Sequence, residues 1–167
     1  ITTYMAAISL KENLEGVAKP TFVFLMLFNT AGAKVSMVDF VALFGPIIGL
    51  VLGFDAINRE RADGTLVKLV SQPIYRDAVI NGKFLASATT IAIMLVSTIL
   101  IISGFGLTLL GVVPGSEEIL RLALYLLISI FYISFWLGVS ILFSILFRSI
   151  ATSALASVAL WLFLLLF

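Results

Sequence analysis

The side chains that could do chemistry gather in one polar stretch, residues 55–83. It holds five of the ten basic and four of the nine acidic residues: Arg59, Arg61, Lys68, Arg76, Lys83, Asp55, Glu60, Asp63 and Asp77. The chain contains no histidine and no cysteine, which removes the commonest general base, thiol nucleophiles and thiolate metal ligands. Because scattered carboxylates are the only remaining ligands, we expect no catalytic site, metal or cofactor in this chain.

The composition indicates an integral membrane protein. Hydrophobic residues make up 62% of the chain and charged residues 11%, and the mean hydropathy is +1.22. A soluble domain is about half apolar and about a quarter charged. The net charge of +1 gives no basic field that would attract nucleic acid, so we expect no nucleic-acid partner. These totals predict an all-α polytopic membrane protein whose main partner is the lipid bilayer.

Four apolar segments are predicted to be transmembrane helices, at residues 37–57, 83–112, 119–147 and 150–167. Between them we expect an extracytoplasmic loop with an interfacial helix at 1–36, a cytoplasmic loop at 58–82, an outer turn at 113–118 and a cytoplasmic turn at 148–149. The charge-free run 84–116 would measure about 50 Å as one helix, which exceeds a hydrocarbon core of about 30 Å. Three glycines near its far end favour a break or a re-entrant turn there: Gly104, Gly106 and Gly111.

The distribution of lysine and arginine predicts the orientation. Five basic residues crowd the loop at 58–82 and its two flanks, and Arg148 lies on the same side. Short cytoplasmic loops carry an excess of Lys and Arg, so this loop is expected in the cytoplasm and the chain in the plasma membrane. The sequence stops at Phe167 inside an apolar run, and we expect it to be part of a longer protein with further helices.

Three glycines recur at intervals of four within the first predicted span: Gly45, Gly49 and Gly53. Such spacing places them on one face of a helix, where another backbone can approach closely. Ordinary helix packing is the favoured interpretation, over a pore-lining role. The stripe is also a candidate for contact with a second copy of the chain.

The middle of the polar loop is predicted to form a short amphipathic helix over residues 64–70. Gly64 allows a left-handed turn, and Thr65 can cap the helix that follows. Leu66, Leu69 and Val70 would form its apolar edge. Pro73 closes the segment, because the residue before a proline is pushed out of the helical region.

A carboxylate at the carboxyl end of the first span needs a partner, because it opposes the helix dipole. Asp55 occupies that place, and Arg59 follows one turn later.

The loop also carries a pattern, E-x3-G-T-L-x2-L-x3-P-x2-R-x5-G-K, formed by Glu60, Gly64, Thr65, Leu66, Leu69, Pro73, Arg76, Gly82 and Lys83. It resembles the cytoplasmic loop of type-2 ATP-binding-cassette (ABC) exporter permeases, including the branch linked to maturation of nitrous-oxide reductase and multicopper enzymes. The likeness covers residues 38–167 and is specific in the loop. It implies six spanning helices, of which four are visible here, and a dimer that carries two ATPase subunits.

The resemblance also implies roles for the loop residues. Residues 64–70 would be a coupling helix seated on the ATPase, with Gly64, Thr65, Leu66, Lys68, Leu69 and Val70 as its coupling residues. Loop bracing would fall to Asp55, Arg59, Glu60, Pro73, Arg76 and Lys83. The chain lacks the G-x4-G-K-[ST] phosphate loop, so ATP and Mg²⁺ would bind in the partner subunit.

Three other classes of function stay open at this point. The least favoured is an intramembrane enzyme, because no predicted span contains paired carboxylates, histidine or a serine with a lysine. A transporter driven by an ion gradient places ionisable residues in mid-membrane, and the predicted spans hold none between their ends. A membrane scaffold that recruits a partner without transport would show the same glycine stripe and the same loop. Stimulation of an ATPase by a substrate would separate the permease from the scaffold.

Overall fold

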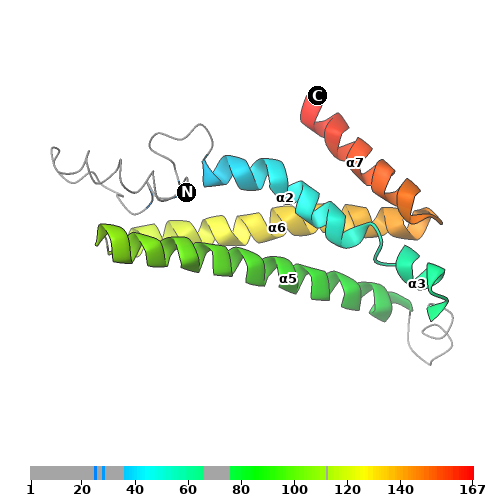
Figure 1. Ribbon diagram of the computed structural model, residues 1–167, viewed down its shortest axis with the longest axis horizontal. Helices are drawn as coiled ribbons and strands as arrows, with labels where there is room; N and C mark the ends of the chain where they lie inside the picture. The colour runs from blue at the N-terminus through cyan, green and yellow to red at the C-terminus, as the bar shows by residue number, and fades with distance from the viewer. Residues whose placement is uncertain (1–24, 26–27, 29–35, 66–75, 112) are drawn as a thin grey trace. The chain divides into compact units, whose positions relative to one another are not determined.

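The computed structural model describes residues 25, 28, 36–65, 76–111 and 113–167, and every regular element within them is helical. The elements are α2 (Met37–Gly53), α3 (Asn58–Ala62), α5 (Arg76–Phe105), the π-helix η2 (Gly106–Leu110), α6 (Ser116–Leu146) and α7 (Ile150–Leu166) (Figure 1). The predicted all-α fold is confirmed. The outer loop expected at 1–36 lies almost entirely outside the described residues.

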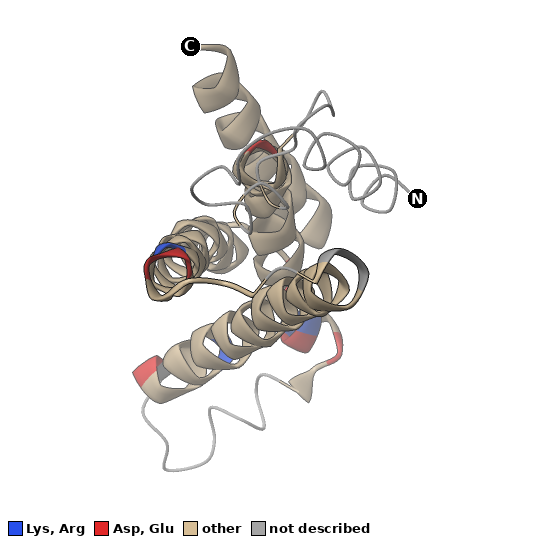
Figure 2. Cartoon of the chain, turned by 90° about the vertical axis from the view of Figure 1, so that its left-hand side faces the viewer, with Lys and Arg blue, Asp and Glu red and all other residues tan. Residues whose placement is uncertain are grey.

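Three helical segments are long and apolar enough to cross a membrane: Met37–Ala62, Asp77–Thr108 and Ser116–Leu146. A shorter apolar helix follows at Ile150–Leu166. The helices are free of charged residues over most of their length (Figure 2). Each predicted span falls on one of these segments, and the membrane borders assigned to them stay predictions.

The helix α5 begins earlier than the span predicted from residue 83. It starts at Arg76 and runs for 30 residues, about 45 Å along its axis. Asp77 lies in its first turn, where a carboxylate is favourable beside the positive end of the helix dipole. The charges at 76 and 77 were assigned to the loop, but they occupy a polar extension of the helix.

The far end of α5 differs from the predicted break. Gly104 continues the helix, which widens into η2 and ends at Gly111 in the left-handed conformation, with a φ of 63°. The Gly111 N–H donates to the carbonyl of Leu107 at 3.2 Å. Glycine adopts this conformation without the steric cost of a Cβ atom, so it terminates helices readily. Of the three glycines at this end, only Gly111 therefore changes the direction of the chain.

Polar residues fix the beginnings of two helices. Before α2, the hydroxyl and N–H of Ser36 donate to Asp39 Oδ2, and the Asp39 N–H donates back to the serine oxygen at 3.1 Å. At α6, the Gly115 N–H donates to Glu118 Oε2 at 2.8 Å. Both pairs satisfy N–H groups that a helix start leaves without partners. The second pair explains why α6 begins at Ser116, three residues before the predicted start at 119.

The chain divides into two compact units. The first comprises Ile1–Leu43 and Met94–Ser129, and the second comprises Phe44–Ile93 and Ile130–Phe167. Within the first, the Tyr125 hydroxyl donates to the carbonyl of Met37 at 3.3 Å. The core of the second is formed by buried apolar side chains of α2, α5 and α6: Leu50, Ile91, Ile133, Leu137 and Ile141. The second unit also contains α3 and every described residue of the polar loop.

Candidate functional site

The candidate site is built around α3, the five-residue helix that follows α2 after a turn at 54–57. The first N–H groups of a helix lack partners within it, and Ile57, which precedes α3, supplies no side-chain cap. The hydroxyl of Ser144, on α6, accepts hydrogen bonds from the N–H groups of Ile57 and Asn58 at 3.1 and 3.2 Å. A serine oxygen has two lone pairs, so it can accept both. The cap of α3 is thus supplied by another helix.

Two side chains of α3 reach the turn between α6 and α7, residues 147–149. Asn58 Nδ2 donates to the carbonyl of Ser149 at 3.3 Å. An amino group of Arg61 donates to Asn58 Oδ1 at 3.2 Å and to the carbonyl of Phe147 at 3.4 Å. The Phe147 carbonyl is one that the end of α6 leaves open, whereas the Ser149 carbonyl also accepts from the N–H of Ser153 in α7. The start of α3 is therefore tied to the end of one helix and to the residue that precedes the next.

An ion pair ties α3 to α5. Lys83 Nζ lies 2.8 Å from Glu60 Oε1, and the two side chains are 28% and 22% exposed. Among the described residues, no donor reaches the second carboxylate oxygen of Glu60, which is buried. Arg76 was predicted to brace the same loop, and its side chain lies outside what the structure describes. The structure thus brings Glu60 and Lys83 together as partners, and the bracing role stays a prediction.

Asp55 has the partner that its position demands. Its carboxylate lies 3.6 Å from an amino group of Arg59, one turn along the chain. The arginine side chain is 72% exposed, so water screens this pair and its contribution to stability is small.

The start of the predicted coupling helix is anchored to α3. Gly64 adopts a positive φ of 70°, the left-handed turn expected there. Thr65 has helical geometry, and its hydroxyl donates to the carbonyl of Glu60 at 3.3 Å. The remaining residues of the coupling helix and its closing proline lie outside the described residues: Leu66, Lys68, Leu69, Val70 and Pro73. Their roles stay predictions.

Sequence reasoning missed Asn58, Arg61 and Ser144, which make most of these contacts. Ser144 lies in an apolar span, and no role was predicted for it, for Asn58 or for Arg61. The pairing joins residues 87 positions apart, and nothing in the local pattern of either segment encodes it. One signal was present: Ser140 and Ser144 are spaced by four, which places two hydroxyls on one face near the end of a span.

Lys83→Met is expected to lower the free energy of unfolding by about 1–2 kcal/mol, because it leaves the partly buried Glu60 carboxylate without its partner. The matched control is Glu117→Gln, which weakens an exposed pair with Arg121 on α6 and should cost less than about 0.5 kcal/mol. Thermal unfolding of the purified full-length protein in detergent measures both. Equal melting temperatures for the two variants would show that the Glu60–Lys83 pair contributes no more than a surface pair.

Two glycines of the stripe on α2, Gly49 and Gly53, face α6 of the same chain. All three glycines are buried. A Cβ atom built on Gly49 would lie 2.6 Å from the carbonyl oxygen of Ile133, and one on Gly53 would lie 2.7 Å from Ser140 Cβ. The Ser140 hydroxyl donates to the carbonyl of Leu50 at 2.8 Å across the same contact. Helix packing within the chain therefore accounts for Gly49 and Gly53, and contact with a second copy stays a prediction.

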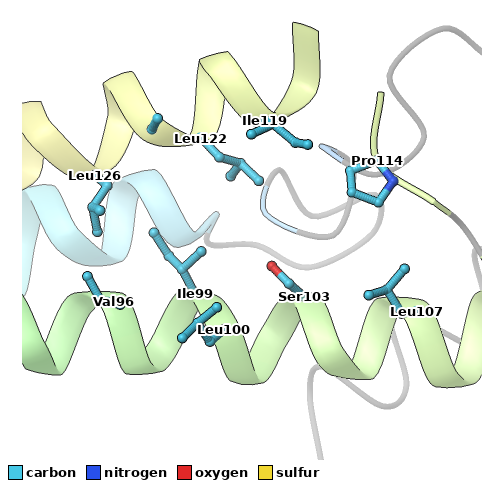
Figure 3. Close-up of a pocket in the computed structure, with 10 residues that line it drawn as sticks. Val96, Ile99, Leu100, Ser103, Leu107, Pro114, Ile119, Leu122 and Leu126 are labelled. Carbon is cyan, nitrogen blue, oxygen red and sulfur yellow. The ribbon is translucent and has the colours of Figure 1, made fainter. Parts of the chain in front are cut away.

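The first unit contains an open cavity of about 290 Å³ between α5 with η2 and α6 (Figure 3). Its lining is aliphatic except for one serine: Val96, Ile99, Leu100, Ser103, Leu107, Pro114, Ile119, Leu122, Ala123 and Leu126. Side chains of the two helices point toward each other across it, as Ile99 and Leu122 do in Figure 3. Its lining can bind hydrocarbon, and it holds no charged group.

The contacts at the candidate site join helices to one another. The described residues contain no group of three acidic side chains close enough to hold a metal ion. The threonine hydroxyls of α5 and η2 donate to carbonyls four residues earlier: those of Thr89, Thr90, Thr98 and Thr108. The site consists of a short helix bonded to its neighbours, so it can hold these helices together and pass a displacement from one to another.

Comparison with known proteins identifies the family. The family model described as "ABC-2 family transporter protein" matches residues 3–167. The probable ABC transporter permease protein NosY of Pseudomonas aeruginosa is 31% identical over 99 residues. The aligned region covers 59% of this chain and 35% of that relative, so the chain spans about a third of its length. No solved structure matches. Because the family model covers nearly the whole chain, the chain belongs to the ABC-2 family of transporter proteins.

Proposed function

We propose that this chain is the membrane-spanning permease subunit of an ABC exporter, powered by ATP hydrolysis in a separate ATPase subunit. The observation that carries the proposal is the family match over residues 3–167. The relative NosY, named as a probable permease, supports the same assignment. Export is the direction that the loop pattern implies through its resemblance to exporter permeases.

The proposed partner docks on the loop at 58–82, on the cytoplasmic side of the plasma membrane. ATP and Mg²⁺ bind in the ATPase, and residues 64–70 fit its surface as the coupling helix. A second permease copy completes the transporter. Closure of the two ATPase subunits on ATP displaces the coupling helix and with it the attached ends of α2 and α5.

The contacts of α3 make this transmission physically reasonable. A loop that hangs freely between two spans absorbs a displacement by bending. Here the described part of the loop is held to α5 by the Glu60–Lys83 pair, and Thr65 is bonded back to Glu60. A push on the coupling helix would therefore move α3 and the beginning of α5 together.

The test is purification of the full-length permease, expressed together with candidate ABC ATPase subunits from the same genome. We expect the ATPase to remain bound through affinity and size-exclusion steps, and the complex to hydrolyse ATP in reconstituted vesicles. If a permease with an intact loop never retains an ATPase, the proposal is wrong, and a scaffold or an ion-driven transporter is favoured instead.

A further inference from the structure

Among the residues that the structure describes, the turn between α6 and α7 is held to the loop by side-chain hydrogen bonds of Asn58 and Arg61. Along the chain, the coupling helix connects to α2 through α3 and to α5 through residues 71–75. No such connection reaches α6 or α7. Yet Ser144 accepts two bonds from the start of α3, and Asn58 and Arg61 donate to carbonyls of the turn. This set of bonds, which we call the α3 junction, joins residues that are 86 to 91 positions apart.

The two bonds to Ser144 lie away from water, whereas the bond to Ser149 is partly buried and the bond to Phe147 is exposed. Ser144 is fully buried, Asn58 is 2% exposed and Ile57 is 6% exposed. When a buried hydrogen bond opens, water does not replace the lost partner, so the donor stays unpaired at a substantial cost. The two buried bonds that share the Ser144 hydroxyl therefore favour the arrangement in which both are formed over any in which one of them is broken. Such a junction holds its segments in one position relative to each other.

We propose that Ser144 and Asn58 are positioning residues that make the α6–α7 turn move together with the loop when the ATPase acts. The motion would then reach the ends of α6 and α7 as well as those of α2 and α5. This inference rests on the proposed function, since it names the path of the same motion. It adds two helices that the chain connectivity of the loop does not reach.

The α3 junction could instead act only as a cap that stabilises α3, and the test must separate the two roles. A cap contributes to melting temperature whether or not nucleotide is bound. A positioning contact also fixes the distance between loop and turn while the ATPase changes state. The decisive quantity is therefore the dependence of that distance on nucleotide, and stability alone does not decide.

Spin labels on Ala62 and Arg148, introduced as Ala62→Cys and Arg148→Cys, report this distance by double electron–electron resonance. Both positions are exposed, and the 167 residues contain no cysteine that would take up label. The measurement uses the full-length permease with its ATPase, without nucleotide and with ATP trapped. In the otherwise native protein we expect one narrow distance that stays the same in both states.

Ser144→Ala removes the shared acceptor. We expect the distribution of the distance between the two labels to become at least twice as broad, and its mean to differ between nucleotide states. Ser140→Ala is the matched control. It makes the same change one turn earlier on α6, at an equally buried hydroxyl that bonds Leu50 of α2. The control should keep the narrow, nucleotide-independent distance. Asn58→Ala, which keeps Ser144 but removes the bond to Ser149, tests the junction independently if Ser144→Ala fails to fold.

The outcomes separate the inference from the proposed function. With the ATPase bound and active, the inference is wrong if the distance between the labels in the native protein changes with nucleotide. It is also wrong if Ser144→Ala gives the same distance distribution as Ser140→Ala. Failure of any ATPase to bind overturns the proposed function, and the motion inferred from it falls with it. A nucleotide-dependent distance in Ser144→Ala and in Asn58→Ala, absent in Ser140→Ala, supports the positioning role.

Discussion

Replacing Leu66 and Leu69 together by aspartate is expected to reduce ATP-dependent transport at least tenfold while membrane insertion is unchanged. The two leucines form the apolar edge of the predicted coupling helix. Burying a leucine side chain at a contact contributes about 1.5–3 kcal/mol, and a carboxylate forced into that contact adds a further cost of desolvation. Each 1.4 kcal/mol lost lowers the affinity about tenfold. The double variant should therefore release the ATPase.

The measurement compares the fraction of ATPase retained on the purified permease and the rate of ATP hydrolysis in vesicles. The matched control is Leu66→Met with Leu69→Met, which preserves an apolar edge of similar volume and should keep both values near native. Normal yield and melting temperature of the aspartate variant would show that only the docking surface has changed. Full retention of the ATPase by that variant would place the docking surface elsewhere on the chain.

The arrangement of charges also bears on the alternative of an ion-driven transporter. From residue 84 to residue 116 the sequence holds no ionisable side chain, and the threonines there bond carbonyls of their own helix. Ion-coupled carriers need ionisable or open polar groups at that depth. Several described ionisable residues of the second unit instead make ion pairs or hydrogen bonds around α3: Asp55, Arg59, Glu60, Arg61 and Lys83. This arrangement favours the proposed subunit, driven through the loop at 58–82, over an ion-driven carrier.

The helices were predictable because membrane spans depend on local composition. A run of about 20 apolar residues has no other way to satisfy its backbone in lipid, so each long run formed a helix. The boundaries were less accurate where polar residues extend a helix beyond the apolar run, as at Arg76 and Ser116. Charged residues mark where a span leaves the hydrocarbon, but the backbone hydrogen bonds of the helix continue until a cap or a turn ends it.

The candidate site was predictable only in part, because its contacts are of two kinds. The pairing of Asp55 with Arg59 is local, since residues four apart on a helical turn are neighbours. The pairing of Ser144 with α3 depends on how α6 packs against α2, which a single sequence does not encode locally. The α3 helix itself was missed because its five residues are mostly charged and carry no apolar period.

Gly49→Ala is expected to lower the free energy of unfolding by about 1–3 kcal/mol, because it overpacks the contact between α2 and α6. The added methyl would lie 2.6 Å from the carbonyl oxygen of Ile133 and 3.0 Å from the backbone nitrogen of Leu137. These are backbone atoms of α6, so no side-chain rotation relieves the contact and the two helices must separate. Separation would also lengthen the bond from Ser140 to Leu50, which spans the same contact.

Gly82→Ala is the matched control, since a Cβ atom at this helical glycine on α5 meets nothing within 4 Å. Alanine favours a helix over glycine by up to about 1 kcal/mol, so this variant should melt at or above the native temperature. Thermal unfolding and the mass of the detergent-solubilised protein, measured together, also separate two uses of the stripe. A stripe that packs within the chain makes Gly49→Ala melt lower at unchanged mass. If the stripe instead served contact with a second copy, Gly49→Ala would halve the mass and leave the melting temperature of the single chain as it was.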